Sequence, residues 1–185
     1  MIELARVLRV VVSAFEESQL GYVVVGSVAA AAWGVARTTR DIDVVVVVDV
    51  DQIEAVLDAL AGAGLYVPTE RAREVAGTSG SFNVLDPEHG GKVDIFVVHA
   101  DDEFTASRLR RSVRADVFGI PCSVASAEDV ILAKLRWRST SRSEVQWRDC
   151  IEMVATNDVD RGYLRAWARR LDVADDLEDL LRSTT

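Results

Sequence analysis

The chain has 185 residues, of which 49% are hydrophobic and 28% are charged, and its formal net charge is −9. Such a composition is ordinary for a globular protein with one substantial core. The longest apolar runs are far shorter than a membrane span, and the amino terminus lacks a basic region followed by a signal core. We therefore expect a cytoplasmic protein with no membrane partner. The acidic charge also argues against indiscriminate coating of nucleic acid.

The first residues follow a helix, strand, helix pattern. Apolar side chains at helical spacing predict an amphipathic helix over residues 2–17, which Gly21 ends. Residues 22–25 are apolar and predict a short buried strand. Ser27 then stands where a helix over residues 28–33 would take its N-cap.

A central strand is the clearest feature of the next segment. Residues 42–48 are mostly β-branched, as expected of a strand buried on both faces, and residues 51–63 have a helical pattern. Residues 65–98 alternate short apolar runs with turn residues, which predicts short strands joined by turns. Within them, residues 77–81 resemble a phosphate-binding loop in composition but lack the lysine and helix of a P-loop, so a hairpin turn is favoured.

The last third of the chain has mainly helical patterns. After a strand near residues 120–124, Ser126 with Asp129 three positions later resembles a capping box and predicts the start of a helix. Most of the remainder to Leu181 is predicted to be helical. The order of the elements indicates an α/β protein without internal repeats.

Two short motifs suit a triphosphate and its metal ions. Gly26 and Ser27 form a turn at a predicted helix start, where free backbone amides bind phosphate oxygens. After a spacer of thirteen residues, Asp41 and Asp43 open the central strand. Alternate residues of a strand project to the same side, so these two carboxylates can share a pair of divalent cations.

A third carboxylate, Asp94, lies within the apolar run 92–98, which also has strand character. If the two aspartate strands are neighbours, we expect Asp41, Asp43 and Asp94 to converge at one point. So much negative charge beside a hydrophobic sheet is costly unless it is compensated. Mg²⁺ is the expected compensation, because it is a hard, oxygen-seeking ion that is common in phosphoryl-transfer sites.

The combination of these motifs resembles the nucleotidyltransferase superfamily related to DNA polymerase β. The string GSVAAAAWGVARTTRDIDVVV, with Arg37, Thr39 and Asp41 at alternating positions, looks like the AbiEii-type nucleotidyltransferases, which include toxins of type IV toxin-antitoxin systems. Residues 130–135 are similar to the lysine motif of that group, and Asp149 falls where the group has a final aspartate.

The resemblance implies a fold and an activity. The fold would be an α/β (α+β) polymerase β-like minimal domain, a mixed sheet flanked by helices, with a catalytic core over residues 1–125 and a helical C-terminal segment over residues 126–185 packed on it. The activity would be transfer of a nucleoside monophosphate from an NTP to an acceptor hydroxyl. The catalytic and metal-binding residues implied are Asp41, Asp43 and Asp94, with two Mg²⁺ ions, or Mn²⁺ in their place. The nucleotide-binding residues implied are Gly26, Ser27, Arg37, Arg40, Lys134 and Asp149.

Each candidate also has an ordinary structural explanation. Aspartates stop strands and cap turns, and the two loop arginines before the central strand are equally explained as surface charges. A lysine on an apolar helix, such as Lys134, commonly snorkels to solvent. Asp149 is explained as the partner of Arg148 or Arg138.

A locally basic stretch bears on the acceptor. Residues 108–148 hold nine basic residues against four acidic ones, on an otherwise acidic chain. If these residues form a basic surface, the stretch favours RNA as the acceptor. By analogy with the toxin group, the acceptor would be a tRNA 3′ end, and an antitoxin protein would be a further partner. Taken as scattered ion pairs, the stretch carries no such meaning. The alternatives are a small-molecule acceptor, such as an aminoglycoside, and a catalytically silent nucleotide-binding module, against which the three carboxylates argue.

Other residues that can carry chemistry are given structural roles. Cys122 and Cys150 lack metal-ligand spacing and are expected to be buried. The two histidines have no partner cluster for zinc. Trp137 lies one helical turn from Lys134 and is a candidate for stacking a base, although packing is the commoner role of such an aromatic residue.

Overall fold

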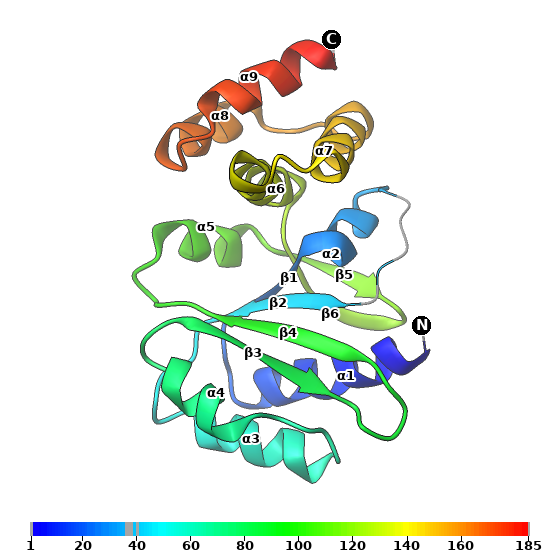
Figure 1. Cartoon of the computed structure of the whole chain (residues 1–185), viewed down its shortest axis with the longest axis vertical. Helices are drawn as coiled ribbons and strands as arrows, with labels where there is room; N and C mark the ends of the chain where they lie inside the picture. Colours follow the sequence, from blue (N-terminus) through cyan, green and yellow to red (C-terminus); the bar gives the residue numbers. More distant parts are fainter. Residues whose placement is uncertain (1, 36–38, 40, 185) are drawn as a thin grey trace.

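A six-stranded mixed sheet forms the centre of this computed structural model, which describes residues 2–35, 39 and 41–184 (Figure 1). The strands lie in the order β3-β4-β2-β1-β6-β5. Their bounds are β1 Tyr22–Val25, β2 Ile42–Val46, β3 Gly80–Leu85, β4 Lys92–Val97, β5 Val113–Val117 and β6 Ile120–Val124. Valine and isoleucine dominate β1 and β2, because branched side chains pack well on a pleated, buried surface.

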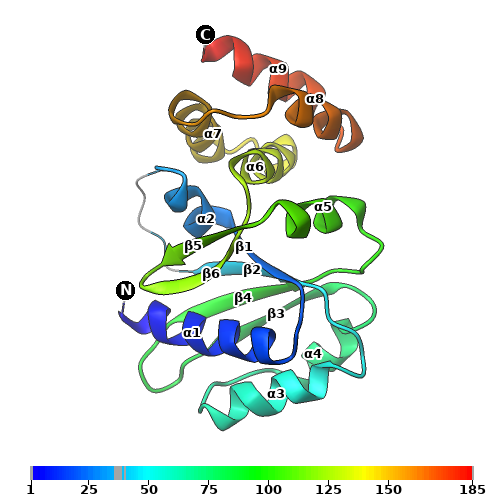
Figure 2. The same ribbon diagram turned by 180° about the vertical axis from the view of Figure 1, so that it is seen from behind.

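Helices cover both faces of the sheet (Figures 1 and 2). Their bounds are α1 Ile2–Glu17, α2 Gly26–Ala32, α3 Ile53–Gly62, α4 Thr69–Val75, α5 Glu103–Arg111, α6 Ala127–Ser141, α7 Glu144–Thr156, α8 Arg161–Arg170 and α9 Ala174–Ser183. α1, α3 and α4 lie on one face, and α2 and α5 lie on the other, with α6 to α9 beyond them. None of the described helices combines the length and the apolar character needed to cross a membrane.

Strand direction brings several chain segments to one edge of the sheet. β1 runs antiparallel to β2, and β2 runs parallel to β4. The end of β1 and the starts of β2 and β4 therefore meet at the same edge. β3 is antiparallel to β4, so its last residue also lies there. The candidate site is built at this edge.

The core between the sheet and α1 fixes which residues face the opposite side. Leu8 and Phe15 of α1 are buried, as are Ile42 of β2 and Ile95 of β4. Each such side chain contributes ~1.5–3 kcal/mol when it leaves water. Because successive residues of a strand alternate faces, burial of Ile42 and Ile95 turns their neighbours, including Asp43, toward the side that carries α2.

Several expected elements are confirmed. α1 and β1 begin and end where the sequence pattern predicts. Ser126 accepts a hydrogen bond from the backbone amide of Asp129 at the start of α6, as the capping pattern predicts. The central strand and the helix after it are present but shorter, because β2 ends at Val46 and α3 begins at Ile53. Both cysteines are buried and free.

The expectation of short strands joined by turns over residues 65–98 is confirmed for β3 and β4 but is wrong for the segment before them. Residues 69–75 form the helix α4, whose buried residues are Ala72 and Val75. Two apolar positions in one short segment are too weak a period to separate a helix from a strand. Residues 77–81 consequently join α4 to β3 and begin that strand, so they do not form the predicted hairpin turn.

Candidate active site

Asp43 and Asp94 lie side by side on neighbouring strands. Asp43 of β2 pairs with Asp94 of β4 and, on its other side, with Val25 at the end of β1. Asn83 of β3 extends this row, because it pairs with Asp94. Neighbouring strands lie ~4.8 Å apart, and paired residues project to the same face. The two aspartate strands are thus neighbours, as the sequence argument required.

Gly26 closes one end of this row. It begins α2 with a φ of +67°, a backbone conformation that side chains rarely adopt. A Cβ atom at this position would lie 2.0 Å from Oδ2 of Asp43. Only glycine therefore allows the backbone to turn directly beside that carboxylate.

Ser27 is not the helix cap that its spacing suggested. The N-cap of α2 is Val25, and among the described residues no side chain caps this helix. The positive φ of Gly26 turns the chain before Ser27, which places the serine inside the first turn. The first N–H groups of a helix have no partner within it, so those of α2 are left to bind another acceptor.

Asp43 carries an unfavourable charge. The residue is half-buried. Burial raises the pKa of its carboxyl group, and repulsion from Asp94 and Asp41 raises it further, whereas Lys92 and Lys134 lower it. The net direction is upward, so burial and the repulsion from the two neighbouring carboxylates together outweigh the attraction of the two lysines.

Lys92 belongs to the candidate site, although the sequence pattern did not single it out. Its Nζ lies 2.8 Å from Oδ2 of Asp94 and 3.3 Å from Oδ1 of Asp41. The hydrogen bond to Asp94 is the main cause of the raised pKa of Lys92. Strand alternation could have revealed this lysine, because Lys92 and Asp94 are two residues apart in β4 and share a face.

The strands that carry the three aspartates are neighbours, as expected, but the three carboxylate groups do not converge at one point. Across residues 2–35, 39 and 41–184, no three acidic, histidine or cysteine side chains lie close enough together to hold a metal ion as they stand. A cation of the chain lies there instead, because the ammonium group of Lys92 pairs with both Asp41 and Asp94.

The residues at this edge nevertheless fit a hard divalent cation. Oδ1 of Asp94 is buried, and no described residue forms a hydrogen bond with it. Leaving a buried carboxylate oxygen without a partner is costly. All three candidate ligands are carboxylates, the groups that Mg²⁺ prefers. The unpartnered oxygen and the raised pKa of Asp43 both indicate a place for additional positive charge.

Lys134 is buried between two helices and does not snorkel to solvent. Its Nζ donates to Oδ2 of Asp149 at 2.7 Å and to Oε1 of Gln146 at 2.8 Å, which links α6 to α7. The side chains of Lys134 and Asp149 are only 5% and 8% exposed. The snorkelling alternative is wrong because α7 covers this face of α6. Lys134 still lowers the pKa of Asp43, so its charge acts on that carboxylate.

Asp149 has a different partner from those considered in the sequence. It pairs with Lys134, whereas Arg138 pairs with Asp176 at 2.7 Å and lies over the ring of Trp147. Arg138 thus connects α6 to α7 and α9.

The two loop arginines, Arg37 and Arg40, lie outside the described residues. Thr39 between them is described, and its Oγ1 donates to the carbonyl oxygen of Asp41 at 2.8 Å. This bond fixes the entry of the chain into β2 and hence the position of Asp41.

The basic stretch over residues 108–148 is largely engaged in internal contacts. Five of its basic residues form ion pairs or lie over aromatic rings: Arg108, Arg111, Arg114, Lys134 and Arg138. The other four are exposed: Arg110, Arg136, Arg142 and Arg148. The stretch therefore matches scattered structural pairs better than a continuous basic surface.

Comparisons with known proteins support the fold. No protein-family model and no curated protein sequence matches the chain. An antigenic nucleotidyltransferase-like protein from Paracoccidioides brasiliensis is similar in structure, with 18% identity, a TM-score of 0.61, and coverage of 97% of this chain and 92% of that one. ANT(2")-Ia in complex with adenylyl-2"-tobramycin is similar, with 16% identity, a TM-score of 0.62, and coverage of 92% of this chain and 98% of that one. The lincomycin-bound lincosamide antibiotic adenylyltransferase LnuA is similar, with 16% identity, a TM-score of 0.53, and coverage of 82% of this chain and 97% of that one.

At these identities the similarity shows the fold alone. The chain has the mixed α/β architecture of nucleotidyltransferase-like proteins, and the expected fold class is confirmed.

Proposed function

We propose that this protein is a Mg²⁺-dependent nucleotidyltransferase, which moves a nucleoside monophosphate from an NTP to an acceptor hydroxyl and releases pyrophosphate. The observation that carries the proposal is the row of Asp43 and Asp94 beside Gly26. Burial and repulsion between the carboxylates raise the pKa of Asp43 there, and one buried oxygen of Asp94 has no partner among the described residues. The nucleotidyltransferase-like fold supports this reading.

Asp41, Asp43 and Asp94 are the residues that would hold the metal, with two Mg²⁺ ions as the proposed number and Mn²⁺ as an alternative ion. When bound, such ions neutralise charge on the triphosphate and lower the pKa of the attacking hydroxyl. The protein contributes by fixing the carboxylates on adjacent strands, which limits their movement relative to one another.

The triphosphate would lie between the start of α2 and α6. The amides of Gly26 and Ser27 bind phosphate oxygens, and Lys134 supplies positive charge from the C-terminal segment. Asp149 orients Lys134 through the 2.7 Å contact between them. Arg37 and Arg40 precede the carboxylates in the chain and would contact the phosphates. In this assignment, residues 1–125 supply the carboxylates and residues 126–185 supply the lysine.

Asp94 would accept the proton of the acceptor hydroxyl. Lys92 binds its Oδ2, and its other oxygen, Oδ1, is buried and has no hydrogen-bond partner among the described residues. The hydroxyl oxygen would then attack the α-phosphorus, and pyrophosphate would leave toward Gly26 and Ser27.

A small molecule is the acceptor that we favour. Ion pairs and ring contacts engage most of the basic stretch that would otherwise guide RNA. An RNA end, with an AbiEii-type toxin role and an antitoxin partner, is the second candidate. The observation that favours it is the exposure of four arginines, which would bind phosphate in a salt-dependent manner: Arg110, Arg136, Arg142 and Arg148.

The test uses two positions of the isotope. The protein is incubated with Mg²⁺, a cell extract and each NTP, labelled at either the α- or the γ-phosphate, after which small molecules, RNA and protein are separated. We expect stable label only from the α-phosphate, and mainly in the small-molecule fraction. Asp43→Asn is the control for activity of the extract itself.

Transfer from the γ-phosphate, or α-label incorporation that is equal with Asp43→Asn, would overturn the proposed reaction. Label confined to RNA, and lost at high salt, would instead replace the small molecule with RNA. A charge reversal at Arg110 suits this second case better than one at Arg111, because Arg111 pairs with Glu128 and lies over the ring of Tyr163.

A further inference from the structure

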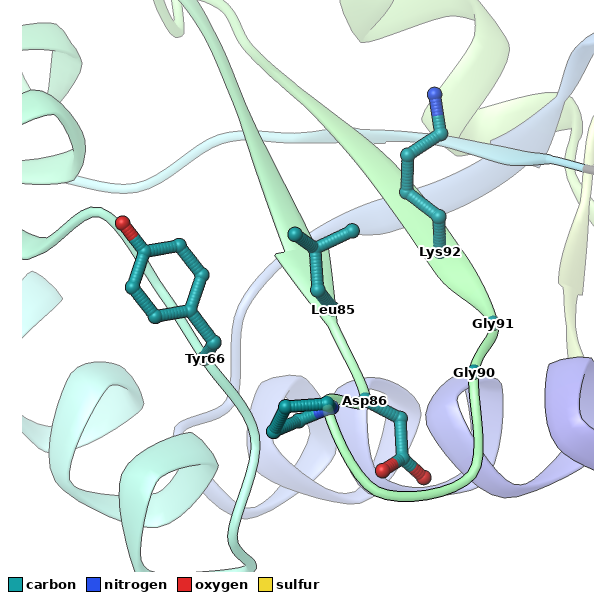
Figure 3. Close-up of a pocket in the computed structure, with 7 residues that line it drawn as sticks. Tyr66, Leu85, Asp86, Gly90, Gly91 and Lys92 are labelled. Atoms are coloured by element: carbon teal, nitrogen blue, oxygen red, sulfur yellow. The ribbon is translucent and has the colours of Figure 1, made fainter.

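A shallow hollow lies at the same edge of the sheet as the carboxylates. It has a volume of ≈ 470 Å³, within the usual ~300–1,000 Å³ of small-molecule sites. Tyr66, Leu85 and Pro87 form its apolar wall, and Lys92 is also part of its lining. Figure 3 shows the side chains of Leu85 and Lys92 on the same side of β3 and β4, with Tyr66 on the neighbouring segment beside β3. The Tyr66 side chain is 56% exposed, so its ring is open to a ligand.

Strand register connects this hollow to the candidate active site. Tyr66 bridges to Leu85, and Leu85 pairs with Lys92. Lys92 in turn contacts Asp41 and Asp94. Tyr66, Leu85 and Lys92 therefore form a second row across the sheet, next to the row of Asn83, Asp94 and Asp43. Because Leu85 pairs with Lys92 and Asp94 is two residues further along β4, a ring over Leu85 would lie diagonally across from Asp94, at ~7–8 Å, a gap that a single sugar can span.

The charges around the hollow limit what it can bind. Asp86 is the acidic residue of the lining, but its carboxylate points away from the hollow (Figure 3). Arg6 and His89 pair with this carboxylate. Burial raises the pKa of Asp86, yet hydrogen bonds from the amides of His89 and Glu88 outweigh it and hold the pKa below its ordinary value. The lining thus presents an apolar ring surface and a lysine, a poor match for a polycation.

The direction of the proposed reaction places the acceptor on this side. An in-line displacement requires the attacking oxygen and the leaving pyrophosphate to lie on opposite sides of the α-phosphorus. The proposed phosphate-binding residues, Gly26 and Ser27, follow β1, whereas Asp94 lies on β4, on the far side of β2. The acceptor must therefore approach from β4 and β3, where the hollow is. Two other pockets lie near Gly21 at the opposite edge, away from the carboxylates.

We infer that the hollow of Tyr66, Leu85 and Pro87 is the acceptor-binding subsite, and that it takes an uncharged or weakly charged small molecule with a flat apolar or aromatic ring next to a hydroxyl-bearing sugar. The inference rests on the proposed function. The ring packs on Tyr66 and Leu85, Lys92 contacts an oxygen of the acceptor, and the sugar hydroxyl gives its proton to Asp94 while pyrophosphate leaves. An RNA duplex is too large for this hollow, and an aminoglycoside finds no unpaired carboxylate in its lining.

The test uses phenyl β-D-glucopyranoside as the probe and saturation-transfer NMR in the presence of Mg²⁺ and a non-hydrolysable ATP analogue. We expect saturation at the phenyl protons with the wild-type protein. Tyr66→Ser should weaken binding of the probe about tenfold, the scale of one lost aromatic contact, whereas Tyr66→Phe should retain it. Val50→Ser, which removes another exposed apolar side chain outside the hollow, is the control and should leave binding unchanged.

Tyr66 is exposed, so its variants should fold, and circular dichroism checks this. Calorimetry with the ATP analogue and Mg²⁺ is run on the same samples. Equal binding of the glucoside to wild-type and Tyr66→Ser, absence of binding to wild-type, or tighter binding of tobramycin than of the glucoside would overturn the subsite. Failure of the wild-type protein to bind the non-hydrolysable analogue of any of the four NTPs with Mg²⁺ would instead overturn the proposed function.

Discussion

Two groups of buried or half-buried carboxylates in this protein differ in how their charges are satisfied. In the C-terminal part, Asp129 is fully buried, and both of its oxygens accept hydrogen bonds, at 2.6 Å from Tyr163 Oη and at 2.9 Å from Ser126 Oγ. At the sheet edge, Asp94 keeps a buried oxygen without a partner in the described chain, and Asp43 is repelled by its neighbours.

The difference indicates that the first group stabilises the fold and that the second group serves a ligand. A buried polar network that is fully satisfied stabilises one arrangement of helices, here α6 and α8. A cluster of like charges that is only partly satisfied lowers stability, and a chain keeps it only where a ligand completes it. Lys134 combines the two roles, because it is paired with Asp149 and still lowers the pKa of Asp43.

The largest expected effect is on activity, at the unsatisfied cluster. Asp43→Asn should lower nucleotidyl transfer by at least about a thousandfold, since losing several kcal/mol of metal stabilisation at ~1.4 kcal/mol per decade gives that scale. In metal-free buffer the variant should be as stable as the wild-type protein or more so, because it removes a repelled charge. Transfer assays and thermal melts check both parts. Near wild-type transfer by the folded variant would contradict the site.

The buried pair should show the largest effect on stability. Lys134→Met leaves Asp149 buried without its lysine, which costs ~3–5 kcal/mol in the free energy of unfolding. The double variant Lys134→Met/Asp149→Leu should recover most of this loss and still bind Mg-NTP more weakly than the wild-type protein. Urea unfolding and calorimetry measure the two quantities. A double variant that restores stability and NTP affinity together would remove Lys134 from the nucleotide site.

Substitution in the hydrogen-bonded network around Asp129 should lower stability and leave activity unchanged, which is the opposite of the effect expected at Asp43. Asp129→Asn weakens the charge-assisted hydrogen bonds from Tyr163 and Ser126 and should cost ~1–3 kcal/mol in the free energy of unfolding. Its transfer activity per folded molecule should match the wild-type value at low temperature. A large loss of activity with unchanged stability would show that this network takes part in the reaction.

The smallest expected effect concerns Lys92. Lys92→Met should lower metal-free stability by only ~0–1 kcal/mol, because the ion pairs of Lys92 are partly solvated. It should also lower the Mg²⁺ concentration needed for half of the thermal shift, since the lysine no longer competes for Asp41 and Asp94. Lys92→Arg keeps the charge and is the control. A higher Mg²⁺ requirement in Lys92→Met would mean that the lysine assists metal binding.

Much of the site was predictable from local pattern. The alternation of Asp41 and Asp43, the strand character around Asp94 and the glycine before α2 are all local features, and the structure joins them by strand register. Ser27 and α4 were assigned incorrectly because a glycine at positive φ and a helix with two buried positions leave weak signals in the sequence.

The sequence by itself determined the alternation of elements and the presence of three aspartates in strand positions, because both depend on residue type and spacing. Tertiary structure decided the partners: Lys92 between Asp41 and Asp94, Lys134 with Asp149, and a hollow at Tyr66 beside the carboxylates. Charge pairing depends on distances of a few ångströms between residues far apart in the chain, so it follows from the packing of strands and helices and not from the order of residues.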